Sequence, residues 1–257
     1  MNYLKVNELK SKKIIYGFFT RKNGFSSNNF ESLNCSYSSG DDKILVKKNI
    51  ELAKLNLGLE NKKLKFLKQT HSSNVEIITK ENFYKKTYAD ACITKDKNIA
   101  LAILTADCAP IILFDKNNTI ICNVHSGWKG CLNNIIKKTI NLLLKENIFL
   151  KDLIAIVGPC MEKQNFEVGY DLKNLFNNFD TKYNKFFSNN DKKNKFFFDM
   201  RGLINFQISE SGVKSIYNIK NDTYSNNHLF FSHRYSLHNG CNPTGRMINI
   251  IGFEEQS

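Results

Sequence analysis

The sequence lacks the features that define several protein classes. Its 257 residues include seven cysteines but no Cys-x-x-Cys pair, and most of the cysteines lie inside apolar runs. An odd number of cysteines placed in this way is not a disulfide framework. No apolar run approaches the roughly 18 residues that a membrane span requires. Residues 1–13 are polar and lack the apolar centre of a secretion signal. We therefore expect a cytoplasmic protein with no membrane partner.

Negative charge is also scarce, since 24 acidic residues face 37 basic ones and the formal net charge is +13. Such an excess is typical of proteins that bind nucleic acids. Here the lysines are scattered, and the sequence shows no basic helix face and no RNP-like or zinc-finger motif. We therefore expect no nucleic-acid partner, although the charge attracts small anions over long range. Arginine is rare, so the four that occur mark candidate sites for a rigid guanidinium fork: Arg21, Arg201, Arg234 and Arg246.

The order of apolar segments predicts a layered α/β fold with a mixed sheet. Continuous apolar runs such as residues 99–104 are typical of central strands that are covered on both faces. Between the runs, residues 131–146 and 42–57 have the spacing of amphipathic helices, and 170–179 and 203–211 predict shorter ones. Residues 177–194, rich in Asn, Lys and Asp, are expected to form a surface loop. No linker divides the chain, and we expect one domain over residues 1–257.

Three strand-like segments end on side chains that bind metals. His71 follows one apolar segment, Cys108 follows the buried run that ends near Thr105, and His125 ends a third segment. Because strand ends meet along an edge of a sheet, where α/β proteins bind ligands, these groups are expected to lie together. Two imidazoles and a thiolate suit zinc or copper, and three protein ligands leave a position open, as in catalytic zinc sites.

Other interpretations of these residues remain open at this stage. Either histidine could be a hydrogen-bonded core or strand-end residue, and Cys108 could be one more small buried side chain. Cys108 could also be a nucleophile paired with a histidine base. Trp128, the single tryptophan, could stack on a base or cover the core. Arg234 and Arg246 could hold a phosphate or carboxylate, or form surface ion pairs.

Taken together, the motifs resemble those of the laccase-domain family, whose members are called polyphenol oxidases or metal-dependent purine nucleoside phosphorylases. They occur in family order over nearly the whole chain. The matching segments are Thr20-Arg-Lys-Asn-Gly24, Ser32-Leu-Asn34, Ser39-Gly-Asp-Asp42, Gln69-Thr-His71, Ala89-Asp90, Thr105-Ala-Asp-Cys108, His125-Ser-Gly-Trp-Lys-Gly130, Gly158-Pro-Cys160, Glu167-Val-Gly169, Phe231-Ser-His-Arg234 and Thr244-Gly-Arg246. One departure is Asn49-Ile50, where the family usually has Asn-Arg.

The resemblance implies a three-layer α/β fold and a metal, zinc or alternatively copper, held by the catalytic residues His71, Cys108 and His125. It also implies phosphorolysis of adenosine, inosine or guanosine to the base and ribose 1-phosphate, with adenosine deamination and methylthioadenosine phosphorolysis as companion activities. Arg234 and Arg246 are candidate phosphate-binding residues. Asp90 and Asp107 are candidate substrate-binding, acid–base or ligand-orienting residues.

Three alternatives to this function stay open. A cysteine-dependent amidohydrolase acting on cell-wall precursors would use Cys108 as its nucleophile. A single-copper polyphenol oxidase would use the same three ligands, whereas a trinuclear copper cluster is excluded because the five histidines form no His-x-His pair. A non-enzymatic basic binding protein would show salt-sensitive nucleic-acid binding. The sequence does not predict the oligomeric state.

Overall fold

A five-stranded mixed sheet forms one half of the centre of the molecule. The computed structural model describes residues 2–9 and 13–255. The strand order of this sheet is β1-β2-β14-β6-β3. Its strands are β1 (Tyr3–Leu4), β2 (Ile14–Phe19), β14 (Met247–Phe253), β6 (Ile99–Thr105) and β3 (Lys63–Phe66). The edge strand β3 runs parallel to β6, whereas the other neighbours pair antiparallel.

A six-stranded mixed sheet forms the other half, with the order β13-β9-β7-β8-β5-β4. Its strands are β13 (Ser215–Asn218), β9 (Leu153–Val157), β7 (Ala109–Asp115), β8 (Ile121–Ser126), β5 (Ala91–Thr94) and β4 (Val75–Ile77). The outer pairs β13–β9 and β4–β5 are parallel, and the central pairs are antiparallel. The predicted α/β class with mixed strand pairing is therefore confirmed, and the mixed pairing occurs in two sheets.

The two sheets stack face to face because their strands are apolar on both sides. In β6, Leu101 and Ile103 pack between the sheets, whereas Ala100 and Ala102 contact the layer of α1 (Lys43–Asn56) on the opposite face. This two-residue alternation is the geometry of a strand. The small alanines allow α1 to approach the sheet closely.

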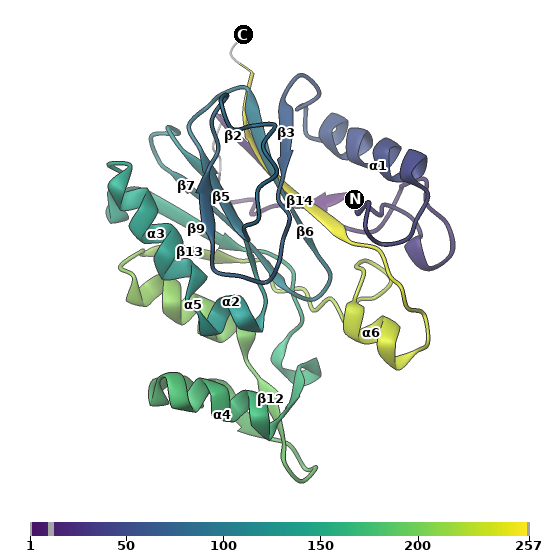
Figure 1. Ribbon diagram of the computed structural model, residues 1–257, viewed down its shortest axis with the longest axis vertical. Helices are drawn as coiled ribbons and strands as arrows, with labels where there is room; N and C mark the ends of the chain where they lie inside the picture. The colour runs from purple at the N-terminus through teal and green to yellow at the C-terminus, as the bar shows by residue number, and fades with distance from the viewer. Residues whose placement is uncertain (1, 10–12, 256–257) are drawn as a thin grey trace.

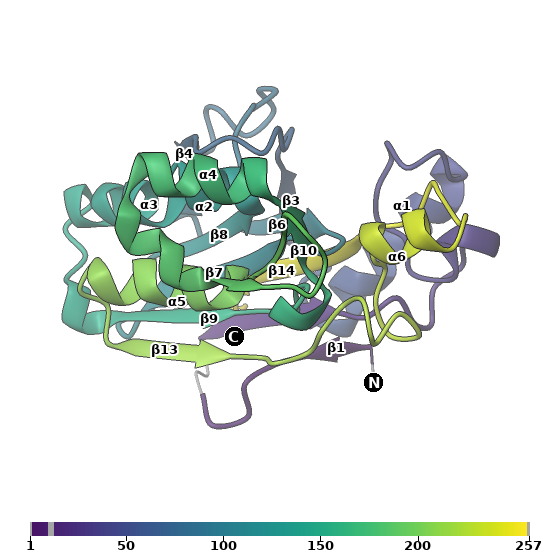
Figure 2. The same ribbon diagram turned by 90° about the horizontal axis from the view of Figure 1, so that it is seen from below.

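Helices cover the outer faces of both sheets (Figure 1). The six-stranded sheet is covered by α2 (Trp128–Leu132), α3 (Ile135–Lys145) and α5 (Met200–Glu210). Next to them, α4 (Tyr170–Phe179) packs on a small sheet of β10 (Glu167–Gly169), β12 (Lys195–Phe198) and β11 (Phe187–Asn189). Figure 2 shows α1 and the short α6 (His233–His238) on the opposite side of the molecule from α3 and α4. Among the described residues, no helix is both long enough and apolar enough to cross a membrane.

Three local predictions were wrong. The helix expected over residues 131–146 is divided into α2 and α3 at Asn134, whose φ of 50° is left-handed. The segment 177–194 is not a loose loop, because it forms a 3₁₀ helix over Thr181–Phe186 and strand β11, and it buries Tyr183 and Phe187. The apolar run at residues 229–232 predicts a further strand, but this described region forms none, and Ser232 instead caps the N-terminus of α6.

Candidate metal centre

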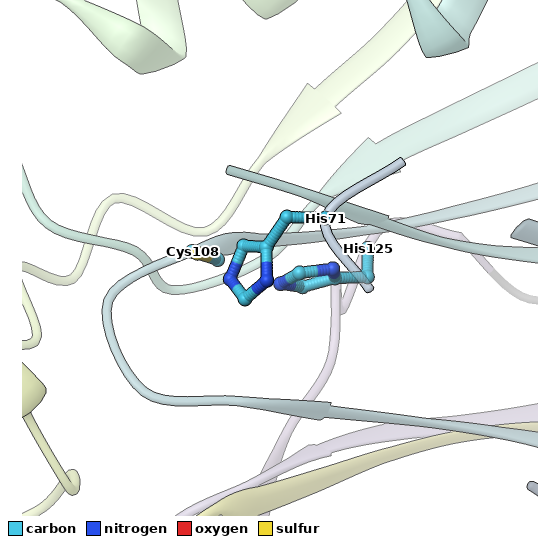
Figure 3. Close-up of side chains that lie close together, drawn as sticks. All are labelled: His71, Cys108 and His125. Atoms are coloured by element: carbon cyan, nitrogen blue, oxygen red, sulfur yellow. The ribbon is translucent and has the colours of Figure 1, made fainter. Parts of the chain in front are cut away.

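His71, Cys108 and His125 lie together at one end of the two sheets (Figure 3). Their potential ligand atoms are all within 4.8 Å of one another. His71 follows β3, Cys108 lies in the turn between β6 and β7, and His125 lies in β8. The two imidazole rings meet edge to face, with their centroids 4.8 Å apart. His71 is exposed and His125 is buried, so the cluster lies between the core and the solvent.

Hydrogen bonds of the Gln69 side chain and two left-handed backbone conformations place His71 and Cys108 in the site. The Gln69 side chain both donates to the carbonyl of Leu104 and accepts from its N–H, each at 2.8 Å, so it continues the β3–β6 pairing beyond the strand. Two residues beyond Gln69, His71 has a left-handed φ of 57°. Asp107, directly before Cys108, also has a positive φ, of 86°. Such conformations cost free energy in residues other than glycine and are concentrated at functional sites.

The fully buried carboxylate of Asp90 connects the two histidines. Its Oδ1 accepts hydrogen bonds from Nδ1 of His125, at 2.8 Å, and from the backbone N–H of His71, at 3.0 Å. Its Oδ2 accepts from the N–H and hydroxyl of Ser72 and from the N–H of Thr70. Because Nδ1 of His125 donates to Asp90, Nε2 is left to face the site. Metal-binding histidines are oriented in this way by buried carboxylates.

The charges inside the cluster support one another. Burial alone would raise the pKa of Cys108, but the adjacent His125 and His71 lower it to about 6. Burial would likewise lower the pKa of His125, but the Cys108 thiolate and Asp90 raise it to about 9. The pKa of Asp90 is held well below its usual range, against the opposing effect of burial, by its bonds to His125 and Ser72. At neutral pH the metal-free cluster therefore contains a thiolate, which is the form of cysteine that binds metals.

Gly127, just before α2, is the residue that allows the cluster to close. A Cβ at this position would lie 2.8 Å from Sγ of Cys108 and 3.3 Å from Cδ2 of His71. The glycine between His125 and Trp128 is therefore required by the close approach of the neighbouring ligands.

The cluster opens into a cavity of about 960 Å³. The cavity is also lined by Asp107, Trp128, His233, Arg234 and Arg246, so it brings the predicted arginines to the predicted ligands. Both oxygens of Asp107 are occupied, because Oδ1 accepts from the hydroxyl of Thr223 and Oδ2 from the N–H of Arg234, each at 2.7 Å. Burial lowers the pKa of His233, and the nearby Arg246 lowers it further.

Sequence reasoning overlooked several residues that build the site. Gln69 was noticed only as part of a motif, and Thr223 and His233 were not singled out. A single sequence gives no signal that Thr223 contacts Asp107, because the two positions are far apart along the chain. Ile50, the departure from the family pattern, is buried against sheet residues such as Ile248 and does not line the cavity.

Residues 15–254 match the family described as multi-copper polyphenol oxidoreductase laccase. The chain belongs to this family. The resemblance identified from the sequence motifs is thereby confirmed. In residues 2–9 and 13–255, the described part of the chain, one group of three or more His, Cys, Asp or Glu side chains has the spacing of a metal site. The family's multi-copper description therefore corresponds here to a single candidate centre.

Proteins similar to this chain include two that are named purine nucleoside phosphorylases and one of known structure. A purine nucleoside phosphorylase of Rickettsia prowazekii is 35% identical over 67% of this chain and 70% of its own length. A purine nucleoside phosphorylase of Haemophilus influenzae is 29% identical over 94% of this chain and 96% of its own. The crystal structure of a Neisseria meningitidis family member is 26% identical, with a TM-score of 0.88 over 99% of this chain and 100% of that one.

The donor set fits a bound metal ion. It combines two imidazoles, which bind metals in their neutral form, with the Cys108 thiol, whose pKa is lowered. Asp90 orients one of the imidazoles. Zinc and copper both accept nitrogen and thiolate sulfur ligands. His71, Cys108 and His125 would hold the ion, and the cavity leaves room for a further ligand on the open side.

Proposed function

We propose that the protein is a zinc-dependent purine nucleoside phosphorylase that converts adenosine, inosine or guanosine and phosphate to the base and ribose 1-phosphate. The observation that carries this proposal is the shared cavity of the His71–Cys108–His125 cluster and the two arginines Arg234 and Arg246. A cluster of metal ligands facing guanidinium groups suits a phosphate-dependent reaction. The names of the relatives from Rickettsia prowazekii and Haemophilus influenzae support it.

The cavity provides groups for both substrates. Arg234 and Arg246 offer planar forks of N–H donors that match phosphate oxygens. Arg246 is anchored by bonds from one of its terminal nitrogens to the carbonyls of Thr244 and Gly245. Trp128 and the ring of Phe166 line the same space and offer faces for a purine.

Phosphorolysis forms one bond and breaks another. A phosphate oxygen bonds to C1′ of the ribose, and the C1′–N9 bond breaks with its electron pair moving to the purine, which then takes up a proton. A bound zinc ion would supply Lewis acidity at this centre. The residues of the chain hold the phosphate through the arginines and fix the tautomer of His125 through Asp90. In this assignment Asp90 and Asp107 are orienting residues, because their oxygens are already engaged by protein donors.

We include adenosine deamination and methylthioadenosine phosphorolysis as companion activities, since each requires the same purine site. A cysteine-dependent amidohydrolase is the second candidate. It is favoured by one specific observation, the lowered pKa of Cys108 beside His125, which also activates cysteine nucleophiles. An acyl-enzyme trapped on Cys108, together with full activity after chelation, would support that alternative.

The direct test is phosphorolysis of inosine by the purified, zinc-loaded protein, followed by release of hypoxanthine. The Cys108→Ala variant should lose at least about a hundred-fold in kcat/KM, because a catalytic ligand is removed. Cys241→Ser is a matched control, since Cys241 is exposed and does not line the cavity. Wild-type turnover that persists undiminished in Cys108→Ala would rule out the proposed role of the cluster.

A further inference from the structure

The cavity of the metal centre extends to a second arm. From His71 its wall follows residues 64–69 along the edge strand β3, and it reaches residues 83–87 on the far side. Six residues of extended chain span up to about 20 Å. The volume of about 960 Å³ lies at the upper end for small-molecule sites. A ligand at the metal end therefore leaves this arm to be filled.

The arm carries positive charge without balancing carboxylates. Lys65, Lys68, Lys85 and Lys86 line it, whereas Asp107, at the metal end, is the one carboxylate among the described residues of the cavity wall. Within residues 2–9 and 13–255, none of these four lysines forms an ion pair with a carboxylate. A concave surface lined by charge of one sign concentrates ligands of the opposite sign.

Lys65 fixes residues 83–87, which form the far wall of the arm. Only 4% of this residue is exposed, and its ammonium donates to the carbonyls of Phe83, at 2.6 Å, and Lys85, at 2.8 Å. The backbone N–H of Lys68 also donates to the carbonyl of Thr87, at 2.8 Å. Glu76 acts on this ammonium through its charge but forms no ion pair with it, so an anion bound nearby would further stabilise the buried cation.

Aromatic rings stand at the rim of the same arm. Tyr84 is 81% exposed and Tyr37 is 51% exposed, and both line the cavity together with Phe83. The ammonium of Lys63, which does not itself line the cavity, lies 5.4 Å from the centroid of the Tyr84 ring. The combination of lysines and exposed rings suits a charged, partly planar ligand.

We propose that this arm binds the phosphoryl groups of a nucleotide whose nucleoside occupies the metal end. The exposed Lys85 and Lys86 contact the phosphoryl oxygens. The buried Lys65 fixes the backbone of the segment that carries these two lysines, through its bonds to the carbonyls of Phe83 and Lys85. The position of the nucleoside rests on the proposed function, whereas the anion-binding arm rests on the charges and the wall alone. The ligand class is thus a nucleoside with a 5′ phosphoryl chain.

The test compares the affinities of inosine and inosine 5′-triphosphate by calorimetry in phosphate-free buffer. The wild type should prefer the triphosphate, and the double variant K85Q/K86Q should lose about ten-fold of that preference, as expected for two partly exposed charged hydrogen bonds. The control K47Q/K48Q removes the same charge from two exposed residues of α1 that do not line the cavity, and it should keep the preference.

Three results would overturn the inference: no preference in the wild type, an unchanged preference in K85Q/K86Q, or equal losses in both double variants, which would indicate diffuse charge only. Inorganic tripolyphosphate, titrated into the same proteins, tests the arm without the nucleoside. Inosine phosphorolysis is measured in parallel. If phosphorolysis fails but tripolyphosphate binding still depends on Lys85 and Lys86, the proposed function is wrong and the arm is confirmed.

Discussion

Replacement of Asp90 by asparagine should weaken metal binding although it leaves the three ligands intact. The carboxylate accepts six hydrogen bonds from Thr70, His71, Ser72 and His125. An asparagine amide keeps one acceptor oxygen and places an NH₂ group at the other position. If the NH₂ faces His125, Nδ1 must become the acceptor and the proton moves to Nε2, which then cannot bind a metal. If it faces Ser72 instead, the N–H donors of the 70–72 turn lose their acceptor.

The magnitude follows from these contacts. Loss of a carboxylate that orients a histidine ligand typically weakens metal binding 10- to 100-fold, which is about 1.4–2.7 kcal/mol. Two partly buried N–H donors left without acceptors should also reduce the free energy of unfolding by about 2–4 kcal/mol. Zinc affinity is measured by competition with a chromophoric chelator, and stability by the urea midpoint of the metal-free protein.

Asp115→Asn is the matched control. Asp115 is 1% exposed and accepts bonds from the N–H groups of Thr119 and Ile120 at the distant β7–β8 turn. Its replacement should reduce stability by a similar amount without changing zinc affinity. A folded Asp90→Asn variant that binds zinc within two-fold of the wild type would contradict the orienting role of Asp90, and so would equal losses of zinc affinity in both variants.

Three further predictions concern the cluster and the neighbouring helix. Gly127→Ala should lower zinc affinity at least about ten-fold, because the new Cβ would lie 2.8 Å from Sγ of Cys108. An unchanged affinity, measured by chelator competition, would show that this close contact does not disturb the ligands. Zinc binding should release about one proton between pH 6 and 9, since the metal-free Cys108 thiol has a pKa of about 6 and His125 one of about 9. The affinity for zinc should therefore rise with pH in this range. Calorimetry in buffers of different ionisation enthalpy measures the protons released, and a value of zero would contradict the prediction. Asn134→Ala should reduce the free energy of unfolding by about 1–3 kcal/mol, because it removes the α3 cap and strains a left-handed residue, whereas Asn134→Gly should lose less, as urea unfolding would show.

Much of the fold could be predicted because its signals are local. The continuous apolar run at residues 99–104 indicates a strand covered on both faces, and β6 occupies Ile99–Thr105. The same logic placed His71, Cys108 and His125 at strand ends, where the turns that follow bring them together. The helix over residues 170–179 was also predicted with its observed bounds.

Other features depend on contacts that a single sequence does not reveal. An apolar strand is covered equally well by helices or by a second sheet, so the stacking of two sheets leaves no separate local signal. Residues 177–194 look like a loop by composition, yet Tyr183 and Phe187 pack with Phe176 of α4 and fix the segment. The left-handed Asn134 divides a helix whose apolar spacing is continuous. The burial of Lys65 could not be predicted either, because in the sequence it looks like any of the scattered surface lysines.

Elemental analysis of the purified protein and its Cys108→Ala variant shows directly whether His71, Cys108 and His125 bind a metal ion. We expect about one zinc ion per chain in the wild type, loss of that ion in Cys108→Ala, and its retention in Cys241→Ser. A wild-type protein that binds no metal after zinc reconstitution, or a Cys108→Ala variant that keeps a full equivalent, would contradict the assignment of the metal centre.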